Sequence, residues 1–353
     1  MKCIRTEDAV GHVLCHDMTQ IIPGVSKGPR FRKGHIVTEE DIPVLLSMGK
    51  ENLFVWELEP GFVHENDAAE RLAALCGREN MAWSETKEGK IELKSEIDGV
   101  FLVDSERLFA VNSIDELMIA TRRGGGRVRH GDKLAGTRVI PLVIREEKLL
   151  AAEQAAGDAP LLAVRPFTLR TAAVITTGSE VAKGRIPDSF TPVVERKLAD
   201  FGIRMTEHVL VEDGLENVRA AIERMKQTPV DMILCTGGMS VDPDDSTPGA
   251  IKASGADIVT YGAPVLPGAM FLLGYYADGR PIMGLPGCVM YAKATIFDLV
   301  LPRIAAGVLI GCTIRNRWKF VFHAVCFCLQ IRSDVQPPCG PQSPVESGPI
   351  QKS

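Results

Sequence analysis

The sequence contains no apolar stretch long enough to cross a lipid bilayer. A membrane-spanning helix needs about 20 predominantly apolar residues. The best candidate, residues 296–310, is interrupted by Asp298 and Arg303. We therefore expect a protein that is not embedded in a membrane.

An excess of positive charge is also missing. The chain carries 40 lysine and arginine residues against 45 aspartate and glutamate residues, which gives a formal net charge of −5. Binding along the phosphate backbone of a nucleic acid needs a positive face. The composition therefore favours a protein without a nucleic-acid partner.

The cysteines follow no regular framework. There are nine of them, an odd number, and the chain starts with a charged segment at residues 1–5. Both observations argue against secretion and predict a cytoplasmic protein. Cys326 and Cys328 are separated by one residue and have no second pair at zinc-like spacing, so a metal site there is the less favoured interpretation.

The length and composition indicate a globular protein with two domains. The 353 residues exceed the about 100–200 residues of an average domain, and 45% of them are hydrophobic. A helical run that ends at residues 157–160 (Gly-Asp-Ala-Pro) is typical of a joint between domains. We predict an α+β, strand-rich accessory domain over residues 1–164 and an α/β domain over residues 165–307. The Pro- and Ser-rich end predicts that residues 308–353 form an atypical, partly disordered tail.

Strands and helices alternate in the predicted second domain. Apolar runs at 172–176, 209–211 and 230–235 are separated by helical stretches at 188–201 and 215–227. This alternation predicts βαβ units and therefore a three-layer α/β fold with a parallel sheet. Further along, residues 270–276 and 281–283 predict a β-hairpin, and residues 288–306 predict a long apolar helix.

Two glycine loops directly follow predicted strands. They are residues 176–180 (Thr-Thr-Gly-Ser-Glu) and residues 236–240 (Thr-Gly-Gly-Met-Ser). Open α/β sheets bind ligands at the carboxyl ends of their strands, where glycine lets backbone N–H groups approach a phosphate. Each loop taken alone is also compatible with a plain connection between a strand and a helix.

Aspartates follow both glycine loops. Asp188 comes after the first, and Asp245 lies in the run 242–248 (Asp-Pro-Asp-Asp-Ser-Thr-Pro) after the second. Magnesium binds proteins through one or two carboxylates together with phosphate oxygens and water. The alternative for Asp245 is a helix start, because Thr247 precedes a proline that suits the first helical turn. The two interpretations are compatible.

The order of these segments over residues 169–307 resembles the molybdopterin-binding domain shared by molybdopterin molybdenumtransferase and molybdopterin adenylyltransferase. The pattern consists of the first glycine loop, residues 188–189 (Asp-Ser), the second glycine loop with Asp245, and residues 285–287 (Leu-Pro-Gly). Residues 245–248 also look like the adenylyltransferase branch, and the paired aspartates 244–245 look like the competence-damage-inducible branch. The resemblance leaves the branch open.

The resemblance implies a molybdenum cofactor biosynthesis protein that binds a small pterin phosphate, molybdopterin or adenylyl-molybdopterin. It implies a transferase that inserts molybdate with magnesium-assisted release of AMP. Asp188 and Asp245 would then be the catalytic and metal-binding residues. The implied ligand-binding residues are Thr177, Gly178, Ser179, Glu180, Thr236, Gly237, Gly238, Ser240, Pro286 and Gly287. We also expect a homo-oligomer.

Two departures from the family pattern keep other functions open. Cys288 and Val289 follow Gly287 where the transferase usually has Asn-Pro, and residues 308–353 show no strand alternation for its terminal β-barrel. A non-catalytic molybdopterin carrier or sensor is one alternative. A nucleotide pyrophosphatase of the competence-damage-inducible type is the other.

The first half of the chain contains one cationic segment. Residues 122–133 hold a glycine run flanked by lysine, arginine and histidine residues, which suits an anion such as molybdate. A solvated surface hairpin is the alternative, which we favour. Residues 15–17 (Cys-His-Asp) and 64–67 (His-Glu-Asn-Asp) have no partners at metal-ligand spacing, and a helix cap explains the second.

Overall fold

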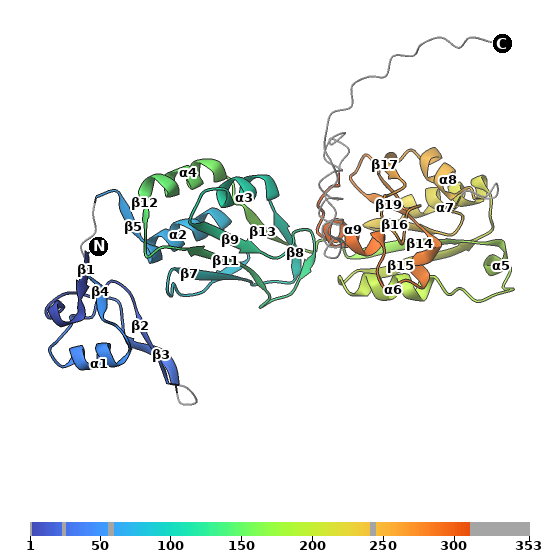
Figure 1. Ribbon diagram of the computed structural model, residues 1–353. Helices are drawn as coiled ribbons and strands as arrows, with labels where there is room; N and C mark the ends of the chain where they lie inside the picture. Colours follow the sequence, from blue (N-terminus) through green and yellow to red (C-terminus); the bar gives the residue numbers. More distant parts are fainter. Residues whose placement is uncertain (1, 23–25, 56–59, 241–244, 311–353) are drawn as a thin grey trace, which may run out of the picture. The chain divides into compact units, whose positions relative to one another are not determined.

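The computed structural model describes residues 2–22, 26–55, 60–240 and 245–310 (Figure 1). Of the predicted tail, only residues 308–310 belong to this part of the chain. No helix in the described ranges combines the length and the apolar character needed to cross a bilayer. Three clusters of buried apolar side chains follow one another along the sequence.

The first cluster lies within residues 2–55. Strand β1 (Lys2–Arg5) pairs antiparallel with β4 (Asn52–Val55), and β2 (Met18–Ile22) pairs with β3 (Ser26–Phe31). The short helices η1 (Thr6–Asp8) and α1 (Asp41–Ser47) complete this segment. Its core contains Ala9, Leu14, Met18, Phe31, Val37, Leu45 and Leu53.

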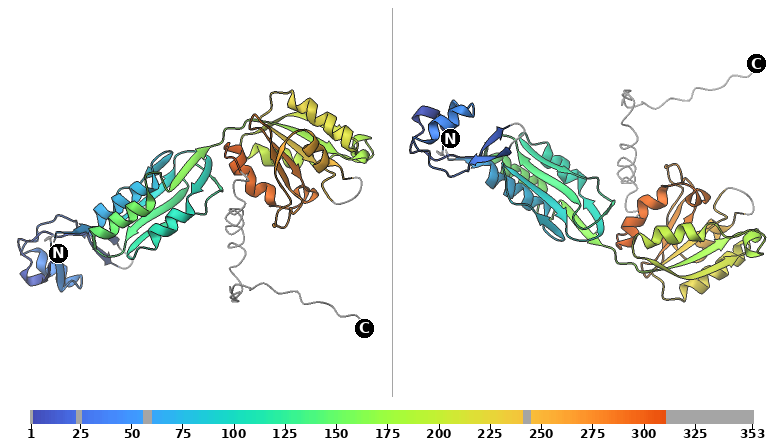
Figure 2. Two further views of the ribbon diagram at one scale, coloured as in Figure 1. Left: turned by 90° about the horizontal axis from the view of Figure 1, so that it is seen from above. Right: turned by 90° about the horizontal axis from the view of Figure 1, so that it is seen from below.

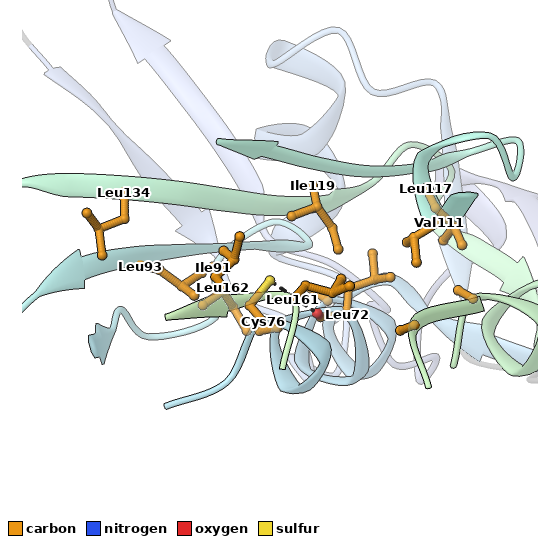
Figure 3. Close-up of a cluster of buried hydrophobic side chains, with 14 of the residues drawn as sticks. Leu72, Cys76, Ile91, Leu93, Val111, Leu117, Ile119, Leu134, Leu161 and Leu162 are labelled. Carbon is orange, nitrogen blue, oxygen red and sulfur yellow. Dashed lines mark hydrogen bonds between the residues drawn. The ribbon is translucent and has the colours of Figure 1, made fainter. Parts of the chain in front are cut away.

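Residues 62–166 form a second α+β segment with a core of its own. Its strands are β5 (Phe62–His64), β6 (Met81–Trp83), β7 (Lys90–Ser95), β8 (Gly99–Val103), β9 (Leu117–Thr121), β10 (Arg127–Val128), β11 (Lys133–Val139), β12 (Val143–Arg145) and β13 (Leu162–Pro166). The helices are α2 (Glu65–Cys76), α3 (Ser105–Asn112) and α4 (Glu146–Ala156). Figure 3 shows Leu72 and Cys76 of α2 beside Ile91 of β7 in this core. The predicted strand-rich character of the first half is confirmed.

The predicted boundary between residues 164 and 165 falls inside β13. This strand pairs with β8 over Leu162–Pro166, so its residues belong to the sheet of the preceding segment. The next strand, β14, begins at Thr171. The division of the chain into three domains stays a prediction.

The last described segment contains a six-stranded sheet. Its order is β15 (Arg204–Val211), β14 (Thr171–Thr177), β16 (Met232–Thr236), β19 (Pro281–Leu285), β18 (Leu272–Tyr275) and β17 (Asp257–Tyr261). The first four strands are parallel, and β18 is antiparallel to both of its neighbours. The predicted parallel sheet is therefore correct for four strands and wrong for this edge. The predicted hairpin explains the difference, because a short turn joins β18 to β19 and permits only antiparallel pairing.

Helices cover both faces of this sheet (Figures 1 and 2). On one face, Ile175 and Ile233 of the sheet pack with Ile222 of α7 (Leu215–Lys226) and Ile251 of α8 (Thr247–Ala253). On the other face lie α6 (Thr191–Ala199) and α9 (Ile296–Ala305), which an ion pair between Lys197 and Asp298 joins. The predicted three-layer arrangement is confirmed.

The long apolar helix predicted over residues 288–306 is confirmed from Ile296 onward and wrong for the residues before it. A 3-10 turn, η2 (Gly287–Met290), comes first, and α9 begins only at Ile296. A capping box explains this start: Thr295 accepts a hydrogen bond from the N–H of Asp298, and the Asp298 side chain accepts one from the N–H of Thr295.

Replacing Thr295 by Ala should lower the free energy of unfolding by about 1 kcal/mol, because the cap hydroxyl is lost. Thr295 is 2% exposed, so water cannot readily take the place of the lost hydroxyl as a hydrogen-bond partner. Denaturant unfolding followed by circular dichroism measures the change. Thr295→Ser keeps the hydroxyl and serves as the matched control. Equal stability of Thr295→Ala and the wild type would contradict the cap.

Candidate functional site

The carboxyl ends of four parallel strands lie at one edge of the sheet. Thr177 of β14 is level with Val211 of β15, and Thr236 of β16 is level with Leu285 of β19. Thr176 and Thr236 are also register partners on β14 and β16. The two glycine loops and residues 285–287 therefore leave neighbouring strands at the same edge, where open α/β sheets bind ligands.

In the first glycine loop, the N–H groups of Gly178 and Ser179 form hydrogen bonds within the protein. The N–H of Gly178 donates to the carbonyl oxygen of Val211 at 3.1 Å. The N–H of Ser179 donates to Oδ2 of Asp213 at 2.8 Å, and Oγ of Ser179 accepts from the N–H of Asp213 at 3.3 Å. This loop is thus tied to the end of β15.

Asp213 is a residue that the sequence analysis missed. It follows β15 within residues 212–214 (Glu-Asp-Gly), so the rule that directed attention to the other strand ends also applies to it. Its place directly after an apolar strand is the signal in the sequence that indicates it.

Two neighbouring threonines fix the end of β14 on both faces of the sheet. The hydroxyl of Thr177 donates to the carbonyl oxygen of Thr236 at 2.8 Å. The hydroxyl of Thr176 lies 3.0 Å from that of Thr191 and 3.2 Å from Nε2 of His208. Successive side chains of a strand point to opposite faces, so the two sets of contacts are independent.

The second glycine loop requires glycine for steric reasons. Gly237 has a φ of +83°, and a Cβ atom there would lie 2.2 Å from the carbonyl oxygen of Thr177. A Cβ atom at Gly238, whose φ is +56°, would lie 2.8 Å from Oγ1 of Thr247. The backbones of the two loops are therefore in direct contact, and positive φ angles favour glycine at both positions.

Thr247 holds the second loop and does not cap α8. Its hydroxyl donates to the carbonyl oxygen of Gly237 at 2.9 Å, and its N–H donates to that of Gly238 at 3.2 Å. The N-cap residue of α8 is Ser246, which makes no side-chain capping hydrogen bond. The alternative that Thr247 is a cap residue is therefore wrong.

Several hydrogen-bonding groups of the second loop have no partner among the described residues. Within the described ranges, neither the N–H of Gly237 nor that of Gly238 donates a hydrogen bond. The hydroxyl of Thr236 is also without a partner there, although this side chain is 0% exposed. Native proteins leave few buried polar groups unpaired, and each costs about 1–3 kcal/mol. These groups are the donors that a phosphate would need.

Asp245 lies beside the second loop. Its Oδ1 is 3.7 Å from the Cβ position of Gly238. Burial raises the pKa of Tyr261, and the negative charge of Asp245 raises it further, so these two side chains are also close. Asp242 and Asp244 lie outside the described residues.

Asp188 lies among the donors of a helix start. Its Oδ1 accepts from the N–H of Phe190 at 2.8 Å and from the N–H of Thr191 at 3.1 Å. Its Oδ2 accepts from the hydroxyl of Thr191 and lies 3.5 Å from Nε2 of His208. Burial, the largest influence, raises the pKa of Asp188, but these hydrogen bonds and His208 lower it, and the net pKa is below the ordinary value of 3.8.

The remaining predicted residues line the same edge. Pro286 precedes η2, and a Cβ atom at Gly287 would meet nothing within 4 Å. Glu180 and Ser240 are exposed. Cys288 follows Gly287, and burial raises the pKa of its thiol, so this thiol favours its neutral form.

Features outside this edge offer weaker sites. In residues 122–133, Arg122 pairs with Asp132 at 2.9 Å, and Asp132 also accepts from the N–H of Arg129. His64 is the N-cap of α2 and accepts from the N–H of Asn66, as the cap interpretation predicts. Across the part of the chain that the structure describes, no group of three or more His, Cys, Asp or Glu side chains could hold a metal ion.

Comparison with known proteins concerns mainly this segment. Residues 173–306 match a protein-family model described as "Probable molybdopterin binding domain". Residues 3–57 match a second model, described as a domain of unknown function.

Curated relatives match the same part of the chain. Molybdopterin molybdenumtransferase of Staphylococcus epidermidis is 32% identical over 133 residues, which are 35% of this chain and 31% of the relative. A Bacillus cereus protein named as competence-damage inducible is 32% identical over 90 residues, which are 26% of this chain and 22% of the relative. The chain thus spans about a third or less of the length of these relatives.

Among solved structures, the molybdopterin biosynthesis enzyme MoaB of Thermus thermophilus is 21% identical. The match covers 40% of this chain and 98% of that chain, with a TM-score of 0.34.

Gly237→Ala should destabilise the protein by on the order of 2 kcal/mol or more, because alanine at a positive φ is strained and its Cβ would clash with Thr177. Gly287→Ala is the matched control, since its Cβ would meet nothing within 4 Å. Melting temperatures of both variants beside the wild type measure the effect. Equal melting temperatures of Gly237→Ala and Gly287→Ala would show that stability does not require the close approach of the loops.

Proposed function

We propose that residues 173–306, which belong to the molybdopterin-binding domain family, bind the phosphate of molybdopterin or adenylyl-molybdopterin at the second glycine loop. The observation that carries the proposal is the pair of N–H groups at Gly237 and Gly238, which no described residue uses. Successive backbone N–H groups in a turn with positive φ angles make a concave site for an anion. The chemistry of the loop and the family thus agree.

The neighbouring residues have separate roles in this proposal. Thr236 supplies a buried hydroxyl at the base of the loop, and Thr177 supports the loop from β14. Gly178 and Ser179 hold the first loop in place, since their N–H groups donate to Val211 and Asp213. Glu180, Ser240 and Gly287 are exposed and would surround the rest of the ligand, and the buried Pro286 holds Gly287 in place.

Magnesium fits one of the two predicted carboxylates. Asp245 lies beside the loop that we assign to the phosphate, and one carboxylate plus phosphate oxygens and water is an ordinary magnesium site. The oxygens of Asp188 are occupied by hydrogen bonds from Phe190 and Thr191, so this carboxylate does not fit. The chemistry that magnesium supplies when bound is neutralisation of phosphate charge.

The activity that we propose is molybdate insertion with release of AMP from adenylyl-molybdopterin, in a molybdenumtransferase-like reaction. Gly237 and Gly238 would hold the phosphate. Asp245 would hold the magnesium ion that neutralises the phosphate charge beside the bond that breaks. The likeness to the S. epidermidis transferase supports this reaction class. A molybdopterin carrier is the second candidate, favoured by Cys288 and Val289 in place of Asn-Pro.

A nucleotide pyrophosphatase is the third candidate. The likeness to the competence-damage inducible protein and the paired aspartates 244–245 favour it. Hydrolysis of free ADP-ribose by the purified protein, without AMP release from adenylyl-molybdopterin, would select this function over the transferase.

Asp245→Asn should slow AMP release by roughly a hundredfold or more, because a charge that stabilises the transition state is lost. Affinity for the adduct should change much less, since the N–H groups of Gly237 and Gly238 carry the phosphate. The assay contains adenylyl-molybdopterin, molybdate and magnesium, and calorimetry gives the affinity. Asp257→Asn, an exposed residue at the amino end of β17, is the matched control.

An unchanged rate in Asp245→Asn would show that the assigned role is wrong. A wild-type protein that binds the adduct but releases no AMP would replace the transferase with the carrier. A wild-type protein that binds neither molybdopterin nor the adduct would contradict the ligand assignment itself.

A further inference from the structure

Four polar side chains meet on the face of the sheet that α6 covers. Nε2 of His208 lies 3.0 Å from the hydroxyl of Thr191, 3.2 Å from that of Thr176 and 3.5 Å from Oδ2 of Asp188. The hydroxyls of Thr176 and Thr191 are 3.0 Å apart. The two threonines are almost fully buried, and the Asp188 side chain is 13% exposed. These contacts join β14, β15 and the first residue of α6.

The hydrogen bonds of Asp188 leave little room for a metal ion. A carboxylate offers about four lone-pair positions. Two backbone N–H groups occupy Oδ1, and the hydroxyl of Thr191 occupies Oδ2 with His208 beside it. Magnesium demands close oxygen ligands in octahedral geometry, so its binding would displace donors that are part of the helix start.

We propose that Asp188 is a positioning residue and not a metal ligand: it fixes the start of α6 and, through Thr191 and His208, the end of β14. The inference deepens the proposed function, because it changes which acidic residues serve the phosphate site. It does not require that the ligand be molybdopterin.

The position of the first glycine loop follows from this network. Thr176 is held on the α6 face, and Thr177 is held on the other face by its hydrogen bond to Thr236. Gly178 starts the loop directly after these two residues. The carbonyl oxygen of Thr177 is also the atom that a Cβ at Gly237 would meet at the shortest distance. Loss of Asp188 should therefore loosen the strand end against which the second loop packs.

The first test measures metal binding without any organic ligand. Titration with Mn²⁺, followed by electron paramagnetic resonance, should give the same dissociation constant for Asp188→Asn and the wild type, within about twofold. Asp245→Asn is the comparison variant, and its affinity should fall by about tenfold or more. An equal loss of affinity in Asp188→Asn and Asp245→Asn, with both variants folded, would overturn the proposal.

The second test measures the loop itself, in EDTA and below the melting temperature. Hydrogen–deuterium exchange at residues 176–180 should be about tenfold faster in Asp188→Asn and in Thr191→Val, because the strand end opens more often. Thr191→Ser keeps the hydroxyl and should restore wild-type exchange. Wild-type exchange in both Asp188→Asn and Thr191→Val would overturn the proposal.

The loss of stability in Asp188→Asn should also depend on pH, and it should be smaller at low pH. Because the folded-state pKa of Asp188 lies below 3.8, its contribution is present above that pH and is lost as the pH falls through the folded-state value. The melting temperatures of the wild type and Asp188→Asn should therefore differ at pH 7 and converge below pH 3.8. A difference that is absent at pH 7 would contradict the network.

These outcomes separate the two proposals. If the wild-type protein binds no Mn²⁺, the magnesium part of the proposed function fails, and the exchange result alone decides the role of Asp188. If the exchange result fails while Asp245→Asn loses Mn²⁺ affinity, the phosphate and metal site stands without the positioning role.

Discussion

The close approach of the two glycine loops determines the geometry of the whole carboxyl edge. A Cβ atom at Gly237 would lie 2.2 Å from the carbonyl oxygen of Thr177, so the backbones touch where a side chain would normally keep them apart. The hydroxyl of Thr177 bonds the end of β16, and the hydroxyl of Thr247 bonds Gly237. The two threonine hydroxyls lie 3.4 Å apart, so these contacts join the end of β14, the second loop and the start of α8.

The two loops therefore have different tasks. In the first, the N–H groups of Gly178 and Ser179 donate to Val211 and Asp213, so we assign to this loop a supporting role. In the second loop, no described residue accepts a hydrogen bond from the N–H of Gly237 or Gly238, and this is why we assign the phosphate to it. The acidic residues divide in the same way: Asp245 lies beside the second loop, whereas Asp188 belongs to the helix start that supports the first.

Much of this arrangement could be predicted from local sequence patterns. Apolar runs and helical periodicity predict β14, β16, α6 and α7, and the glycine loops at the strand ends indicate the same family whose model matches residues 173–306. The partners of individual side chains could not be predicted in this way. Asp188 and His208 are in contact although they lie twenty positions apart in the sequence. The local sequence predicts Thr247 as a helix cap, but its hydroxyl donates to the carbonyl oxygen of Gly237. The start of α9 at Ile296 likewise depends on a capping box, which cannot be predicted from apolar composition alone.

The most direct test of the phosphate site observes the glycine N–H groups themselves. Nuclear magnetic resonance of protein labelled with ¹⁵N in its 33 glycines can follow each amide as adenylyl-molybdopterin is added. The account predicts that the largest shifts occur at Gly237 and Gly238. Unchanged resonances at these two residues under saturating ligand, or larger shifts in the glycine run of residues 124–126, would contradict it.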